Sequence, residues 1–174
     1  YGDKRLLFRN AGSASNWVAN ADDAAAMAMM ADAAGIRTGF STTGRSDAHY
    51  DRVAGQLVVL GARLIRREEL KLLGDHNVAN ALAAIALAYR AGGDPAAVAA
   101  ALPTFAGVDR RLTWRGEGHG VTILDDYAHH PTEIRVTIEA ARSRYQPKRT
   151  WIVFQPHQAS RTRHFMNEIA ESFG

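Results

Sequence analysis

The chain has 174 residues, of which 47% are apolar, so it is long enough to bury a substantial core and is expected to be globular. Its formal charge is only +3, and it has no dense basic tract and no aromatic platform between basic residues, which argues against a nucleic-acid binder. The absence of cysteine excludes disulfides and thiolate metal sites. No apolar run reaches the roughly 20 residues of a membrane-spanning helix, so we expect a cytoplasmic protein that does not enter a membrane.

The first part of the sequence mixes predicted strands and helices, separated by short polar segments. In chain order we expect a strand in "RLLFRN", a strand in "SNWVANADD" that ends in a polar cluster, a helix over residues 24–34, a strand in "IRTGFS", a polar and mobile loop in "TTGRSDAHYDRVAG", and a hairpin around Gly61 in "QLVVLGARLIRR". The clearest helix follows in "GDHNVANALAAIALAYRAGG", and Asp94 and Pro95 then open another helix.

The composition changes after residue 107, where we place a domain boundary. From there we expect strands in "LTWRG" and "VTILDD", a helix from Pro131 to about Ser143, a strand in "TWIVF", and a last helix beginning near Ser160. Strand, crossover helix and strand in that order predict a parallel sheet. The predicted fold class is therefore α/β, with parts of two domains (residues 1–107 and 108–174), each having a mostly parallel sheet and flanking helices.

Polar side chains follow two of the predicted strands of the second part. "VTILDD" leads into "YAHHP", and "TWIVF" leads into "QPHQASRTR". In an open parallel sheet, ligands bind at the carboxyl ends of strands, so Asp126 is a candidate for ligand hydroxyls and Arg161 and Arg163 for a carboxylate or phosphate. The alternative is structural: Asp126 caps a turn, His129 and His130 are solvated, and Ser160 caps the last helix.

A metal site is a competing interpretation, because adjacent histidines with nearby aspartates are typical zinc ligands. Neighbouring residues in an extended segment point to opposite sides, so His129 and His130 bind one ion only if the loop turns sharply. The usual ligand spacings are absent, and we assign no residue to a metal.

Two further groups of residues are candidates for anion or nucleotide binding. "GDHNVANALAA" places His76 and Asn77 at a helix N-terminus, where free N–H groups and an amide side chain suit an anion or the edge of a base. The alternative there is that Asp75 or Asn77 caps the helix. Arg110 and Arg111 lie at the expected domain junction and either reach a ligand or solvate a hinge.

Taken in order, "NADD", "GDHNVANALAAIA", "FAGVDRRL", "DDYAHHPTEI" and "FQPHQASRTR" resemble the Mur ligases of peptidoglycan synthesis. The similarity is close from about Leu70 to the C-terminus and looser before it. The resemblance implies an ATP-dependent amide ligase in which the substrate carboxylate is phosphorylated and then attacked by an amino acid. The double histidine and "QPH" favour UDP-N-acetylmuramate and L-alanine as substrates, with ATP and Mg²⁺ as cofactors. Gln158 and Ala159 depart from the Arg-Tyr of many such ligases, which weakens the inference about the amino acid.

The resemblance also implies a role for each polar group. Residues implied to contact ATP are His76 and Asn77 at the adenine, Asp126 at the ribose, and Arg110 or Arg111 at the phosphates. Residues implied to surround L-alanine are Tyr127, His129, His157 and Arg161, of which His129, His157 and Arg161 are the expected catalytic residues and Arg161 holds the carboxylate. This set agrees with the chemistry, because the reaction develops negative charge that cationic side chains offset.

No G-x-x-x-x-G-K-[ST] phosphate-binding loop occurs in the sequence. The family has that loop and its metal ligands upstream of the matched motifs, so we expect this chain to be a partial ligase, inactive by itself. Three alternatives stay open: a related Mur ligase that recycles murein tripeptide or adds another amino acid, a noncatalytic nucleotide-binding module, and a metal-dependent hydrolase that uses the histidine pair.

Overall fold

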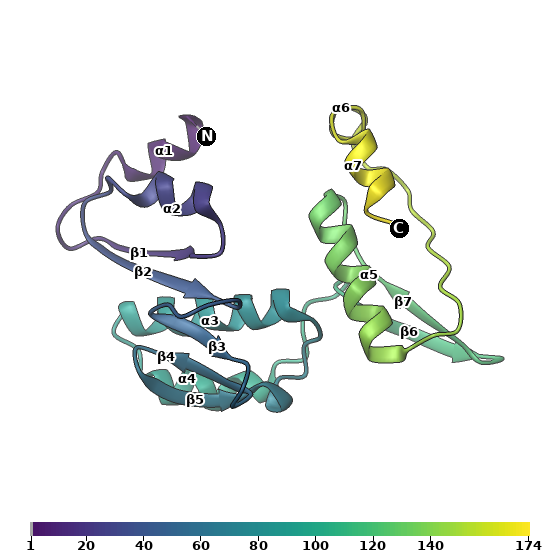
Figure 1. Ribbon diagram of the computed structural model, residues 1–174, viewed down its shortest axis with the longest axis horizontal. Helices are drawn as coiled ribbons and strands as arrows, with labels where there is room; N and C mark the ends of the chain where they lie inside the picture. Colours follow the sequence, from purple (N-terminus) through teal and green to yellow (C-terminus); the bar gives the residue numbers. More distant parts are fainter. Residues whose placement is uncertain (1) are drawn as a thin grey trace. The chain divides into compact units, whose positions relative to one another are not determined.

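The computed structural model of this protein describes residues 2–174, and its helices and strands form two units (Figure 1). The first unit ends at Phe105 and the second begins at Ala106, which is two residues before the junction expected from the sequence. The α/β class is confirmed. Within residues 2–174, no helix is long and apolar enough to span a membrane.

A five-stranded sheet forms the centre of the first unit. Its strands, in spatial and sequence order, are β1 (Asn16–Asn20), β2 (Ile36–Ser41), β3 (Ala48–Asp51), β4 (Gln56–Val59) and β5 (Ala62–Arg66). The first three strands are parallel, whereas β3, β4 and β5 are antiparallel. The predicted β4–β5 hairpin is confirmed: Leu60 and Gly61 have φ of 50° and 84°, the positive values that a two-residue hairpin turn of this kind requires.

Helices cover this sheet and complete its core. They are α2 (Ala24–Met30), α3 (Asp75–Arg90) and α4 (Pro95–Ala101), with the short 3₁₀ turns η2 (Arg67–Glu69) and η3 (Leu102–Thr104). Asp23 and Asp94 cap α2 and α4 by accepting hydrogen bonds from N–H groups of their first turns. The apolar stripe of α3 packs against β1 to β4, and Leu57, Leu82 and Ile85 are fully buried there. α2 ends at Met30, four residues earlier than expected.

Two expectations for the first unit were wrong. "RLLFRN" does not form a strand, because α1 (Gly2–Arg5) and η1 (Leu6–Phe8) occupy this region. The Phe8 ring packs edge-on against the Trp17 ring, with 4.7 Å between centroids. The segment expected to be a mobile loop contains β3. Ala48 in that strand is fully buried, so packing of a few apolar side chains decided the structure of an otherwise polar segment.

The second unit consists of a hairpin, a long helix and two short helices. The hairpin joins β6 (Thr113–Gly118) to β7 (Val121–Asp125), α5 (Pro131–Tyr145) follows, and α6 (Ala159–His164) and α7 (Met166–Glu171) end the chain. Its small core lies between α5 and α7, where Ile134, Ile138 and Ile169 are buried.

The parallel sheet expected in the second unit is not formed among the described residues. β6 and β7 are antiparallel, and "TWIVF" is an extended segment without strand pairing, visible in Figure 1 between α5 and α6. Trp151 and Val153 in that segment are 81% and 99% exposed. An apolar run of this kind predicts a buried strand, but a strand needs a hydrogen-bonded neighbour, and none lies beside it here.

Candidate functional site

The loop between β7 and α5 holds most of the polar residues predicted in the second unit. Asp126, the first residue after β7, accepts hydrogen bonds from the N–H of Leu112 at 2.8 Å and from that of Ala128 at 2.7 Å. The structural role considered for Asp126 is therefore present in the fold. A carboxylate oxygen accepts more than one hydrogen bond, so the loop geometry leaves lone pairs for a ligand hydroxyl.

The Tyr127 ring is the centre of a cluster of cationic and imidazole side chains. The Arg110 guanidinium carbon lies 4.7 Å from the ring centroid, and the rings of His129 and His157 approach it edge-on at 5.2 and 5.9 Å. The segment after the hairpin and the segment after residue 155 thus meet at one aromatic ring, although the parallel sheet edge predicted to bring them together is not formed. Guanidinium and imidazole groups can donate hydrogen bonds to a carboxylate, so this cluster suits a small ligand that carries one.

Backbone contacts hold Arg110 against this loop. Its carbonyl accepts a hydrogen bond from the N–H of Tyr127 at 2.8 Å, and Arg110 and Leu112 have φ of 59° and 48°, which non-glycine residues rarely adopt. Arg115, which the sequence reading missed, donates to Asp109 and Asp125 at 2.9 Å each. Asp109 and Asp125 lie six and ten residues from Arg115, so no local sequence pattern pairs them with it.

His129 and Glu133 form a second polar pair beside the Tyr127 ring. His129 Nδ1 lies 2.9 Å from the Tyr127 carbonyl, an acceptor, so this nitrogen carries a proton and Nε2 is directed elsewhere. Glu133 accepts from the N–H groups of His129 and His130 at 3.0 and 3.3 Å. Burial raises the pKa of Glu133, but the His129 N–H, the His129 charge, the His130 N–H and Arg111 together hold this pKa below its ordinary value.

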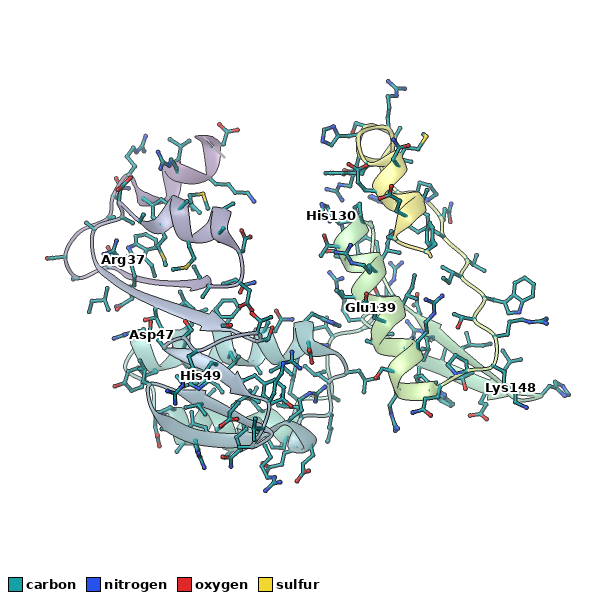
Figure 2. The ribbon with its side chains drawn as sticks, viewed as in Figure 1. Arg37, Asp47, His49, His130, Glu139 and Lys148 are labelled. Carbon is teal, nitrogen blue, oxygen red and sulfur yellow. The ribbon has the colours of Figure 1, made fainter. Side chains whose placement is uncertain are left out.

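His130 has a structural role. Its Nδ1 accepts from the Thr132 N–H at 3.3 Å, so it caps α5, and its ring packs on Phe165 with 4.9 Å between centroids. Figure 2 shows His130 at the N-terminal end of α5, with Glu139 farther along the same helix. Within residues 2–174, no three imidazole or carboxylate groups come together to hold a metal ion.

Arg161 is half-buried in α6 and makes no side-chain hydrogen bond or ion pair with the residues that the structure describes. No hydrogen bond or ion pair therefore joins Arg161 to Tyr127, His129 or His157 within residues 2–174. Its guanidinium is available for a ligand, whereas Arg163, two residues farther along the helix, is exposed.

The nucleotide candidates of the first unit lie in the first turn of α3. Asn77 donates to the Leu73 carbonyl at 2.7 Å and lies 3.0 Å from His76 Nε2, and Asn80 donates to Asn77 Oδ1 at 3.3 Å. Neither Asp75 nor Asn77 caps the helix, because the N-cap is Gly74, which has no side chain. Asn80 was missed in the sequence, although its spacing of three residues from Asn77 places both on one face.

Comparison with protein families identifies both units. Residues 1–88 match the Mur ligase middle domain, and residues 110–174 match the glutamate ligase domain of Mur ligases. The chain belongs to the Mur ligase family. The resemblance drawn from the motifs is confirmed at this level.

Relatives and solved structures agree with this assignment. The chain is 44% identical over 141 residues to the UDP-N-acetylmuramate–L-alanine ligase of Roseiflexus sp. (strain RS-1), which covers 81% of this chain and 29% of the relative. It is 51% identical over 106 residues to the ligase of the same name from Nostoc punctiforme, covering 60% of this chain and 22% of the relative. This Mur ligase chain thus spans less than a third of the length of these relatives.

Two solved structures share the fold. The UDP-N-acetylmuramate-alanine ligase of Thermotoga maritima is 29% identical with a TM-score of 0.60, over 78% of this chain and 31% of that one. A murein peptide ligase of Psychrobacter arcticus is 26% identical with a TM-score of 0.67, over 90% of this chain and 34% of that one. Both are Mur ligases, which extends the family assignment to the three-dimensional fold.

Proposed function

We propose that this chain is part of an ATP-dependent ligase that joins L-alanine to UDP-N-acetylmuramate in the cytoplasm. The relatives named for that reaction are 44% and 51% identical to it over 141 and 106 residues. The observation that carries the proposal is the cluster at Tyr127, because Arg110, His129 and His157 surround one aromatic ring beside a helix N-terminus.

In this proposal the Tyr127 cluster receives the amino acid. L-Alanine has no side-chain functional group, so its recognition depends on its carboxylate, its amine and one methyl group. Arg161 binds the carboxylate, for which an arginine without an internal partner is suited. His129 and His157, whose rings both contact the Tyr127 ring, hold the amine in place and accept its proton, and the aromatic ring excludes water from the methyl group.

The nucleotide is proposed to contact three groups of this chain. Asn77 and His76 in the first turn of α3 face the adenine, Asp126 receives a ribose hydroxyl, and Arg110 or Arg111 approaches the phosphates. ATP supplies the phosphoryl group that activates the substrate carboxylate. Within each unit the side chains suit the contact proposed for them: Asn77 and Asn80 of the first unit offer amide groups, and Asp126 of the second unit offers a carboxylate. They do not provide a Mg²⁺ site, so none is assigned to residues 2–174.

Phosphate release tests the proposal. The protein translated from the complete reading frame that contains this chain is incubated with ATP, Mg²⁺ and UDP-N-acetylmuramate, and with L-alanine, glycine or L-serine in turn. We expect release that requires the sugar nucleotide and is fastest with L-alanine. A further arm replaces the amino acid with murein tripeptide, because the Psychrobacter arcticus enzyme shares this fold. The assignment would be overturned by phosphate release with murein tripeptide but with none of the three amino acids. It would also be overturned by the absence of release in every arm.

A further inference from the structure

We propose that Arg52 is a positioning residue for the nucleotide site, because it holds the first turn of α3 on the loop that follows β2. The role rests on the proposed function of His76 and Asn77, which are the second and third residues of that helix. Arg52 lies just after β3 and donates to Asp75, the residue before His76 in the helix, so the role that we assign to it acts through Asp75.

Arg52 joins two segments that are distant in sequence, the loop after β2 and the first turn of α3. Its Nη2 donates to Asp75 Oδ2 at 2.6 Å, and its Nε donates to the Thr42 carbonyl at 3.0 Å. The guanidinium also lies 5.2 Å from the centroid of the Tyr50 ring, which limits its orientation. Because the donors of a guanidinium are fixed in one plane, fastening one of them to Thr42 fixes the direction from which Asp75 is held.

The loop that supplies the Thr42 carbonyl is itself fastened to the end of β1. Asp22 Oδ2 accepts from the Thr42 N–H at 2.8 Å, and Asp22 Oδ1 accepts from the hydroxyls of Ser41 and Thr43 at 2.5 and 2.7 Å. Burial raises the pKa of Asp22, but these hydrogen bonds outweigh it and hold the pKa below its ordinary value. The Asp22 carboxylate thus fastens the loop by hydrogen bonds, and Arg52 donates to a carbonyl of this fastened loop.

The first turn of α3 has no side-chain cap. Its N-cap is Gly74 with φ of 80°, and no side chain caps the free N–H groups. A cation at this end of a helix is unfavourable with respect to the helix dipole, so Arg52 is tolerated there because Asp75 neutralises it. Removal of Asp75 alone therefore leaves an uncompensated cation, whereas removal of both partners does not. The proposal therefore predicts that the Asp75 variant is affected more than the double variant, whereas a general loss of stability would affect the double variant more.

The first experiment measures amide hydrogen exchange of residues 77–80 in the 174-residue chain. We expect Arg52→Gln to speed this exchange roughly two- to fivefold, the range for an exposed ion pair, and to leave exchange in β4 unchanged. Asp75→Asn should speed it more than the double variant Arg52→Gln/Asp75→Asn. The matched control is Arg66→Gln, whose pair with Glu68 is similarly exposed but includes no residue of α3. Equal exchange in the unchanged chain and Arg52→Gln would overturn the proposal.

The second experiment measures ATP binding and the KM values of the protein from the complete reading frame. Arg52→Gln should raise the Kd for ATP roughly two- to fivefold without changing the KM for L-alanine, and Arg52→Lys should restore part of the affinity through the ion pair. Faster exchange with unchanged ATP binding would overturn the positioning role. Absence of ATP binding in the unchanged protein would overturn the proposed function and this role together, while the exchange data would still show whether Arg52 holds α3.

Discussion

The Asp126 carboxylate accepts a hydrogen bond from the backbone N–H of Leu112, which lies fourteen residues earlier in the chain. The same side chain accepts from the Ala128 N–H, so it joins the segment before β6 to the loop after β7. Arg110 and Tyr127 are therefore brought together by a residue that is also a ribose candidate. The Asp126 carboxylate thus has a structural role in this loop and a proposed role in ribose binding. Separating the two roles requires a measurement of stability and a measurement of ligand binding.

Asp126→Ala should destabilise the second unit by about 1–2 kcal/mol, because two N–H groups lose a charged acceptor. Asp126→Asn should cost less, since the amide oxygen still accepts one of these hydrogen bonds. Urea denaturation followed by the fluorescence of Trp114 and Trp151 gives both values. Asp109→Ala is the control, because Asp109 is 72% exposed and its loss should change stability by less than about 0.5 kcal/mol. Equal effects of Asp126→Ala and Asp109→Ala would show that Asp126 does not organise the loop.

Glu133 should make the second unit sensitive to acid. Its pKa in the folded state is below the ordinary Glu value of 4.5, so the folded state binds fewer protons than the unfolded state. The resulting stability is fully present above the unfolded pKa and is lost as pH falls through the folded pKa.

Replacing Glu133 with Gln should therefore reduce the fall of the urea midpoint between about pH 5 and pH 3. The side chain is 37% exposed and screened by water, so the difference should stay below about 1 kcal/mol. Glu139→Gln, an exposed position on the same helix, should leave the pH dependence as it is in the unchanged chain. A Glu133→Gln profile parallel to that of the unchanged chain would exclude this role.

Two isoleucines of the second unit should differ in how much their replacement destabilises the unit, because one is buried and the other is exposed. Ile138 is 8% exposed in the core between α5 and α7, and Ile123 on β7 is 56% exposed. We expect Ile138→Ala to cost about 2–5 kcal/mol and Ile123→Ala less than about 0.5 kcal/mol, as measured by thermal unfolding. Similar losses at both positions would mean that β7 is covered in solution.

Local sequence signals predicted much of the first unit. The helix pattern of residues 75–90, the Asp94 cap and the Gly61 turn each depend on a few neighbouring residues, and all three are present. The strand "TWIVF" was not formed because strand formation depends on a partner, which no local pattern supplies.

The sequence likewise predicted part of the candidate site. The motif residues Tyr127, His129 and His157 do meet in the fold, but the carboxylates that hold the loops are visible only in three dimensions. Arg52 and Asp75 are 23 residues apart in sequence, and nothing in their local patterns pairs them. The roles assigned to the site residues stay predictions until ligands are measured.

The most direct test of the central claim is the KM for L-alanine in the protein from the complete reading frame, compared between Arg161→Ala and Arg163→Ala. Both arginines lie in α6, but only Arg161 is half-buried, so its loss should raise the KM for L-alanine at least roughly tenfold with an unchanged KM for ATP. Arg163→Ala should leave both values unchanged. Equal KM values in the two variants, or no L-alanine-dependent phosphate release from the unchanged protein, would contradict the account.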